Sequence, residues 1–280
     1  MADRVELVTG ASSGLGKASA VALASTGAHV VLLCRDASRG QAALEEVRAR
    51  SGNANTELAL ADLSSLDSVR RFVKSFAARH DRLHVLLNCA GLLRVRRTLT
   101  VDGFETTFAV NHLGPFLLTN LLRPLLEAGA PSRVVTVSSE FHRWARMDFD
   151  DLHGARRYGP LTAYARSKLA NILFTVELSR RLAGTGVTAN ALHPGLARTN
   201  MGKGNGLRWA LTARPFFYLM SSPERAARAP VYLATAPDVA TVTGRYFVRR
   251  RESAPSRAAR DEEAQRRLWE VSCALTGIRG

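Results

Sequence analysis

The alternation of short apolar runs with longer segments of helical period constrains this chain most strongly. Valine- and leucine-rich runs begin near residues 5, 30, 58, 85, 133 and 187, and helical segments separate them. Runs that are apolar at nearly every position indicate strands buried on both faces, as in a parallel sheet covered by helices. With right-handed crossovers, such units build a Rossmann-type doubly wound sheet. We therefore predict an α/β fold in three layers, α/β/α, as a single domain over residues 1–280.

The expected elements follow from these runs and their spacing. Strands are predicted at 5–8, 30–33, 58–60, 85–87, 133–137, 187–192 and 244–248, and helices at about 14–26, 38–50, 65–79, 102–128, 161–183, 223–235 and 258–274. Two long connections interrupt the rhythm, at 140–160 and at about 195–222. Long connections in a compact domain are usually functional, and the second holds Trp209, Phe216 and Phe217. We expect it to form a lid over an apolar substrate, although a dimer contact would also suit these residues.

Composition excludes several classes of protein. Apolar residues make up 46% of the 280 positions, which excludes a disordered chain. Cys34, Cys89 and Cys273 are far apart and odd in number, so we expect free thiols in a reducing compartment. Cysteines and histidines are not clustered along the sequence, so no metal site is predicted. No run reaches the roughly 18 apolar residues of a membrane span, and no cleavable signal is evident, so a cytoplasmic protein is expected.

The net charge of +15 raises the question of a nucleic-acid partner. Most of this charge lies in residues 141–280, where basic residues are scattered apart from the run 249–251. Neither the interleaved aromatic and basic residues of an RNA platform nor a recognition-helix pattern is present. A basic solvated surface without a nucleic-acid partner is the better interpretation.

A glycine-rich turn follows the first predicted strand and precedes the first helix. It reads Thr9-Gly10-Ala-Ser-Ser-Gly14-Leu-Gly16. Glycines let a phosphate approach the backbone, and a helix N-terminus offers free N–H groups with a positive dipole end. We predict that a cofactor phosphate binds here. The candidate contacts are Gly10, Ser12, Ser13, Gly14, Leu15 and Gly16.

This spacing resembles the Thr-Gly-x-x-x-Gly-x-Gly turn of the short-chain dehydrogenase/reductase family rather than G-x-G-x-x-G. Tyr164-Ala-Arg-Ser-Lys168 is similar to that family's Tyr-x-x-x-Lys motif, and Ser139 ends the fifth strand where the family has a serine. Asn111 matches the family's helix asparagine. The resemblance implies a catalytic tetrad of Asn111, Ser139, Tyr164 and Lys168, with Ser138 as a competitor for the role of Ser139.

Further motifs resemble those of the family in the same order. Asn88-Cys89-Ala90-Gly91 is similar to Asn-Asn-Ala-Gly, with Cys89 as a departure. The resemblance implies additional cofactor contacts from several positions. These are Asp62, Leu63, Asn88, Ala90, Gly91, Tyr164, Lys168, Pro194, Gly195 and Thr199.

The tetrad also follows from physical chemistry. Tyr164 and Lys168 are four residues apart on a predicted helix and therefore share one face. A tyrosine with an ordinary pKa near 10 is a poor acid–base catalyst at pH 7. A lysine ammonium and the positive ring of an oxidised nicotinamide would lower that pKa. Ser139 would hold the substrate oxygen. Asn111, by resemblance, would kink its helix and bind a water that links Lys168 to solvent.

Cofactor choice is expected at the end of the second strand. NAD enzymes place an acidic residue here for the ribose hydroxyls, whereas an arginine accommodates the 2′-phosphate of NADP. Cys34 occupies the expected acidic position and Arg35 follows it. Lys17 is a second candidate for the phosphate. Asp36 argues for NAD, although it can instead cap the next helix. We predict NADP(H).

A closer resemblance is to the retinol dehydrogenases. It rests on the run from Thr106 to Phe116, on the run from Arg166 to Phe174 and on His193-Pro194-Gly195. It implies an NADPH-dependent oxidoreductase that acts on the carbonyl or alcohol group of a bulky apolar substrate, such as retinal or another lipophilic aldehyde or ketone. A catalytically silent NADP-binding sensor or scaffold is the alternative. A homodimer or a homotetramer is compatible with the sequence.

Overall fold

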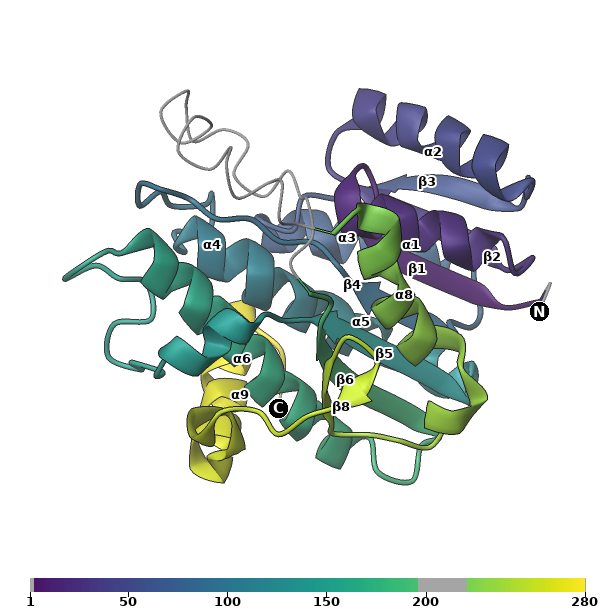
Figure 1. Cartoon of the computed structure of the whole chain (residues 1–280). Coiled ribbons are helices and arrows are strands. Elements are labelled where there is room, and N and C mark those ends of the chain that lie inside the picture. The colour runs from purple at the N-terminus through teal and green to yellow at the C-terminus, as the bar shows by residue number, and fades with distance from the viewer. Residues whose placement is uncertain (1–2, 196–220, 280) are drawn as a thin grey trace.

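The computed structural model describes residues 3–195 and 221–279. One eight-stranded sheet crosses the molecule in the order β3-β2-β1-β4-β5-β6-β7-β8, with helices on both faces (Figure 1). The strands are β1 (Val5–Thr9), β2 (His29–Cys34), β3 (Thr56–Leu60), β4 (Val85–Asn88), β5 (Ser132–Val137), β6 (Val187–His193), β7 (Tyr246–Val248) and β8 (Arg251–Glu252). All pairings are parallel except that of β7 with β8. The predicted α/β doubly wound fold is confirmed.

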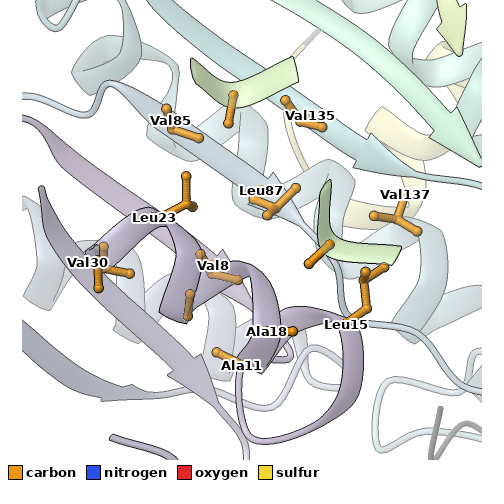
Figure 2. Close-up of a cluster of buried hydrophobic side chains, with 14 of the residues drawn as sticks. Val8, Ala11, Leu15, Ala18, Leu23, Val30, Val85, Leu87, Val135 and Val137 are labelled. Atoms are coloured by element: carbon orange, nitrogen blue, oxygen red, sulfur yellow. The ribbon is translucent and has the colours of Figure 1, made fainter. Parts of the chain in front are cut away.

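One face of the sheet is covered by three helices that share a core cluster. They are α1 (Gly14–Ala24), α2 (Ala37–Ser51) and α8 (Pro223–Thr235). In Figure 2, Val8, Val85 and Val135 of three neighbouring strands lie in one cluster with Leu15 and Leu23 of α1. Burying a side chain of this size contributes about 1.5–3 kcal/mol to folding, so this packing fixes the position of α1 on the sheet.

The opposite face is covered by a second set of helices. They are α3 (Leu66–Ala77), α5 (Gly114–Ala128) and α6 (Pro160–Arg181), which contribute to another core cluster. The central strands supply both clusters. Leu32 of β2 faces the first, whereas the adjacent Val31 and Leu33 face the second. This alternation explains why the strands are apolar at consecutive positions.

The single helix predicted over 102–128 is divided in the structure. It consists of a short α4 (Thr106–Phe108), a π-helical turn η1 (Ala109–Leu113) and α5. The spacing of apolar residues does not reveal this division. Every residue from 106 to 119 is buried, so the segment has no exposed polar face whose shift would mark the change of helix type. The π-helical turn contains Asn111, one of the predicted tetrad residues.

The C-terminal helix begins later than its predicted start at residue 258. A 3₁₀ turn, η4 (Arg257–Arg260), comes first. Helix α9 (Glu262–Thr276) follows, and the Asp261 carboxylate caps it by accepting from the Ala264 amide at 3.1 Å. Two other 3₁₀ turns are η2 (Glu140–Trp144) and η3 (Pro237–Val239). The short β8 was not predicted; Arg249, with φ of 58°, lies in the turn that precedes it.

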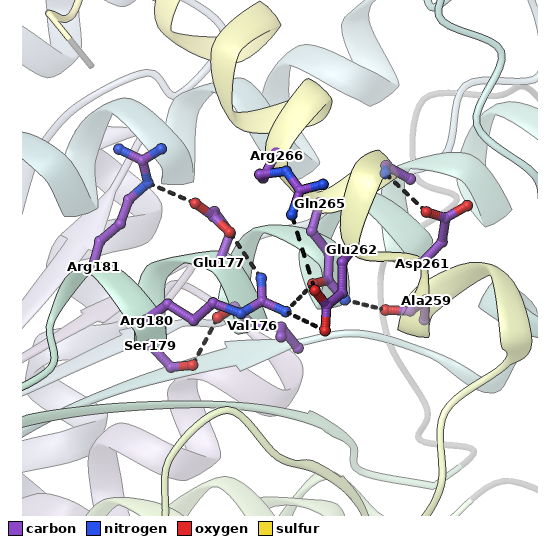
Figure 3. A network of polar contacts seen from close by, with 11 residues as sticks. Val176, Glu177, Ser179, Arg180, Arg181, Ala259, Asp261, Glu262, Gln265 and Arg266 are labelled. Carbon is purple, nitrogen blue, oxygen red and sulfur yellow. Dashed lines mark hydrogen bonds and ion pairs between the residues drawn. The ribbon is translucent and has the colours of Figure 1, made fainter.

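Helix α9 packs against α6 through a polar network and through contacts of the Trp269 ring. Arg180 donates to the buried Glu177 carboxylate at 2.9 Å and to Gln265 Oε1 at 2.6 Å (Figure 3). Arg181 donates to the same carboxylate at 2.8 Å, and its guanidinium lies 4.4 Å from the Trp269 ring centre. These contacts hold α9 against the helix that carries the predicted Tyr164 and Lys168.

Within the described ranges, no helix has both the length and the apolar character needed to cross a membrane. Most of the predicted lid, residues 196–220 with Trp209, Phe216 and Phe217, lies outside the described residues.

Candidate active site

The candidate site lies where the strand order reverses. Strands β1 and β4 are neighbours, and the connection after β1 runs to β2 on one side whereas the connection after β4 runs to β5 on the other. A crevice at such a point is the usual ligand site of an open α/β sheet. The loops after β1 and β4 meet here. A Cβ atom on Gly10 would lie 2.9 Å from Ala90 Cα, so only glycine allows these two loops to come so close.

The glycine-rich turn leaves its helix N-terminus without a side-chain cap. Ser13 precedes α1 but makes no capping hydrogen bond, whereas Asp36 and Ser65 cap α2 and α3. A Cβ atom on Gly16 would lie 2.5 Å from the Gly10 carbonyl oxygen, so this position also requires glycine. The first amides of α1 are thus available to a phosphate, which favours an anionic group at this end of the helix.

Tyr164 and Lys168 lie buried on one face of α6, in the register that their spacing predicts. The Lys168 ammonium is 5.6 Å from the centre of the Tyr164 ring and donates to the Val137 carbonyl at 3.1 Å. No carboxylate pairs with Lys168 among the residues that the structure describes. An ammonium has three N–H donors, so donors remain for a ligand and for the phenol.

Asn111 connects the loop after β4 to α6. Its Oδ1 accepts from the Leu92 amide at 2.8 Å, and its Nδ2 donates to the Leu92 carbonyl and to Ser167 Oγ, both at 2.9 Å. Gly91 lies next to two of the four predicted tetrad residues, Lys168 and Asn111. A Cβ atom there would lie 3.3 Å from Lys168 Nζ and 3.4 Å from Asn111 Oδ1. Because both amide donors of Asn111 bind protein atoms, this side chain orders the loop that faces Lys168.

The two serines after β5 have different partners. Ser138 Oγ donates to the Lys168 carbonyl at 2.7 Å, so its hydroxyl holds β5 to α6. Ser139 Oγ lies near enough to the Tyr164 phenol to lower its pKa, and among the described residues it accepts a long bond from the Phe141 amide, at 3.4 Å. The geometry therefore places Ser139, not Ser138, beside the phenol.

Burial dominates the electrostatics of the tyrosine and the lysine. It raises the pKa of Tyr164 to about 12, against a smaller opposite effect of the hydrogen bond with Ser139. It also lowers the pKa of Lys168 to about 8. At pH 7 the phenol is therefore neutral and the ammonium is charged. The lowering of the tyrosine pKa expected from sequence required both Lys168 and the positive ring of an oxidised nicotinamide; in the chain alone, burial of Tyr164 dominates and raises its pKa.

Arg35 directly follows the end of β2 and is the candidate ligand of the cofactor phosphate there. Arg35 is exposed and forms no hydrogen bond or ion pair with other described residues. Asp36 caps α2, since its Oδ1 accepts from the Arg39 amide at 2.8 Å. Lys17, the second candidate for a phosphate, instead forms an ion pair with Glu46. Of the two candidate cations, Arg35 is therefore the one available to a ligand.

The remaining predicted cofactor residues lie around the same crevice, except one. Asp62 is half-buried and its Oδ1 accepts from the Ser64 amide at 2.9 Å, while Leu63 is buried. Asn88 is buried, and its Oδ1 has no partner among the described residues. Pro194 and Gly195, the latter with φ of 95°, follow β6. Thr199 lies outside the described residues.

Sequence reasoning missed the support for Ser139. His142 Nδ1–H donates to the Ser139 carbonyl at 2.7 Å, and its Nε2 accepts from the Ser256 amide at 3.0 Å. Its ring packs edge-on against Tyr246, whose hydroxyl donates to Glu140 at 2.6 Å. The only signal in the sequence is a histidine three residues after the serine, which is too common a spacing to single it out.

Comparison with known proteins identifies the family. The family model of the short chain dehydrogenases matches residues 4–207. The chain belongs to this family. Retinol dehydrogenase 13 from Homo sapiens is 46% identical over 278 residues, which cover 97% of this chain and 84% of the human protein. Retinol dehydrogenase 14 from Mus musculus is 44% identical over 293 residues, covering 99% of this chain and 87% of the mouse protein.

Solved structures agree with this assignment. A crystal structure of an uncharacterized protein from Mycobacterium Paratuberculosis has a TM-score of 0.80 and 37% identity, and covers 99% of this chain and 94% of that one. A short chain dehydrogenase from Burkholderia cenocepacia in complex with NADP has a TM-score of 0.69 and 25% identity, covering 93% and 98% of the two chains. This short-chain dehydrogenase is thus an oxidoreductase that acts on CH–OH groups and resembles retinol dehydrogenases, which favours the enzyme over the sensor or scaffold.

The residues present fit a nicotinamide cofactor. Gly10 and Gly16 let the turn fold tightly against the backbone of Ala90 and against itself, and the uncapped start of α1 supplies amides. Among the described residues, Asn88 Oδ1 has no hydrogen-bond partner and the Lys168 ammonium has no carboxylate partner, so they offer an acceptor and donors to a ligand.

Proposed function

We propose that this enzyme uses NADP(H) to interconvert the carbonyl and alcohol forms of a bulky apolar substrate, with Tyr164 as general acid and base. The observation that carries the proposal is the arrangement on α6. A buried phenol lies beside the Ser139 hydroxyl, and a buried ammonium without a carboxylate partner among the described residues lies 5.6 Å from the phenol ring. This arrangement supports proton transfer to a substrate oxygen placed between the two hydroxyls.

The proton chemistry follows from the charges of the side chains. When bound, NADPH supplies the hydride that adds to the carbonyl carbon. Tyr164, neutral at pH 7, donates its proton to the carbonyl oxygen, and Ser139 stabilises that oxygen by a hydrogen bond. The Lys168 ammonium stabilises the phenolate that remains, because opposite charges attract strongly in a buried site. Hydride and proton together convert the carbonyl to an alcohol, and oxidation of the alcohol reverses both transfers.

The choice of NADP rests on Arg35. A guanidinium forms paired, charge-assisted hydrogen bonds with a phosphate, and Arg35 has no described partner that competes for it. Asp36 is occupied as the cap of α2. The complex of the Burkholderia cenocepacia relative with NADP supports the same choice.

An apolar substrate is supported by an aromatic pair beside the phenol. The Phe141 ring lies 5.8 Å from the Tyr164 ring in an edge-to-face arrangement, and the Trp144 ring lies 4.8 Å from Phe141. Trp144 is 78% exposed, which is unusual for so large an apolar side chain. Together they form an aromatic surface that leads from solvent to Tyr164. The retinol dehydrogenase relatives support a substrate of this class.

The test is a panel of retinal, long-chain aldehydes and short aldehydes, followed by NADPH absorbance. Tyr164→Phe should lower kcat by at least about a hundredfold, since general acid catalysis typically contributes this much. Tyr158→Phe is the matched control, because it also removes a partly buried phenol that donates to a protein oxygen, the Arg94 carbonyl. A Tyr164→Phe enzyme with a kcat near that of the wild type would refute the proposed role. Equal kcat/KM for short and long aldehydes would refute the substrate class.

A further inference from the structure

Three potential metal ligands meet at the end of the sheet opposite the candidate active site. His29 is the first residue of β2, Glu57 is the second residue of β3, and His80 follows the end of α3. One ligand atom from each lies within 4.8 Å of the other two, and this is the sole group of its kind in the described ranges. Sequence spacing does not predict this group, because neighbouring members are more than twenty positions apart.

The fold explains why these side chains converge. Val31 pairs with Glu57 across β2 and β3, and His29 lies two residues before Val31, on the same face of the sheet. That face packs against α3, where the His80 ring lies 4.4 Å from the Phe76 ring. Three separate and packed elements therefore supply the three ligands.

The spacing is close to what a small divalent ion requires. His80 Nε2 is 3.1 Å from Glu57 Oε1, and His29 Nε2 is 3.8 Å from Glu57 Oε2. In a tetrahedral zinc site with bonds of about 2.0–2.1 Å, neighbouring ligand atoms are about 3.3 Å apart. The two observed distances go to the two oxygens of one carboxylate and lie on either side of this value, and all three ligand atoms lie within 4.8 Å of one another, so the side chains must rotate to bring one atom of each to an ion.

The donor set selects the kind of ion. Two imidazoles and one carboxylate suit zinc and similar transition metals, whereas magnesium and calcium prefer oxygen ligands alone. One feature opposes binding: the Arg79 guanidinium lies 3.8 Å from Glu57 Oε1. Its side chain is 47% exposed, so it is free to move into solvent.

We propose that His29, Glu57 and His80 bind one divalent transition-metal ion, with zinc as the best fit and water in the fourth position. The ion would connect β2, the edge strand β3 and the segment after α3, and so stabilise the fold away from the proposed reaction. A ligand that binds only the folded state raises its stability in proportion to the logarithm of ligand concentration over Kd.

The experiment uses untagged protein that has been treated with a chelator and dialysed. Titration with zinc by calorimetry, and with cobalt by visible absorbance, should each show one equivalent, and zinc should raise Tm. His29→Gln, Glu57→Gln and His80→Gln should each weaken binding by at least about tenfold and abolish the zinc-dependent rise in Tm. His153→Gln, at another half-buried histidine, is the matched control and should bind like the wild type.

Arg79→Gln provides a test in the opposite direction. It removes a cation beside Glu57, so zinc should bind several-fold more tightly than in the wild type. If His29, Glu57 and His80 form only a hydrogen-bonded cluster, Arg79→Gln removes one partner of Glu57, and neither the wild type nor any variant binds zinc. The proposal is overturned if the wild type shows no saturable binding, or if the three ligand variants bind zinc as tightly as it does. NADPH-dependent activity is measured alongside, and it should be unchanged in all these variants because the proposed function does not involve this end of the sheet.

Discussion

Replacement of Ser138 and of Ser139 by alanine should affect different properties of the enzyme, although the two residues are neighbours. Both side chains are buried after β5, with 2% and 6% exposure. Ser138 Oγ donates to the Lys168 carbonyl at 2.7 Å, whereas Ser139 Oγ faces the Tyr164 phenol. The first contact connects two elements of the fold, and the second lies where the substrate oxygen is expected.

The magnitudes follow from these contacts. Ser138→Ala removes one buried hydrogen bond, which contributes about 0.5–1.5 kcal/mol to the free energy of unfolding. For a chain of this size, that loss corresponds to a fall in Tm of a few degrees. Ser139→Ala removes a donor to the substrate oxygen, and loss of such a donor lowers kcat by about 10²–10³. Its effect on Tm should be smaller, because its one bond to the backbone is long, at 3.4 Å.

The assay measures urea-induced unfolding and steady-state reduction of one saturating aldehyde for both variants. Ser138→Ala should keep a kcat within about threefold of the wild type, and Ser139→Ala should keep nearly all of its stability. The reasoning is refuted if both variants lose kcat equally, or if Ser138→Ala alone loses it. In either case the assignment of the two hydroxyls would be wrong.

Three other predictions concern the cofactor, the lysine and the support of Ser139. Arg35→Ala should lower kcat/KM for NADPH by at least about tenfold, because each charge-assisted bond to the 2′-phosphate contributes about 1.5–3 kcal/mol. The kcat/KM for NADH should be unchanged. A wild type that prefers NADH would contradict this prediction. Burial lowers the pKa of Lys168 to about 8, so kcat/KM for NADPH should fall as the pH rises through about 8 and the ammonium loses its proton. A pH profile that stays flat well above pH 8 would exclude a role of the Lys168 charge in the reaction. His142→Phe removes the imidazole bond to the Ser139 carbonyl, which still accepts from the backbone amide of residue 142, and it leaves the Ser256 amide without a partner among the described residues. This should lower the free energy of unfolding by about 1–3 kcal/mol and lower kcat as well, whereas an unchanged urea midpoint would show that the His142 bonds are not needed.

The sheet could be predicted from sequence because its strands are buried on both faces. Val30 to Leu33 form an uninterrupted apolar run, and the structure places alternate members in the two core clusters. The glycine-rich turn could also be predicted from sequence. The structure gives the reason for its glycines, since a Cβ atom on Gly10 or Gly16 would lie within 3 Å of backbone atoms. Local rules of this kind need no knowledge of distant residues.

Features that depend on distant residues could not be predicted in this way. The π-helical turn at Asn111 lies in a stretch that is buried on all sides, so its periodicity carries no phase. The competition between Lys17 and Arg35 for a phosphate depended on Glu46, which pairs with Lys17. The cluster of His29 and His80 with a carboxylate appears only when β2, β3 and α3 are packed together.

The contact between His142 and Ser256 has a consequence for the order of events during protein synthesis. The two residues are separated by 114 positions, and ribosomes add about 5–20 residues per second. A growing chain therefore carries Asn111, Ser139, Tyr164 and Lys168 for several seconds before the amide that fixes His142 has been made. Helix α9, which packs on the back of α6, is made later still. The nascent chain would thus bear its proposed reactive side chains for several seconds before the contacts that His142 and α9 make with their surroundings can form.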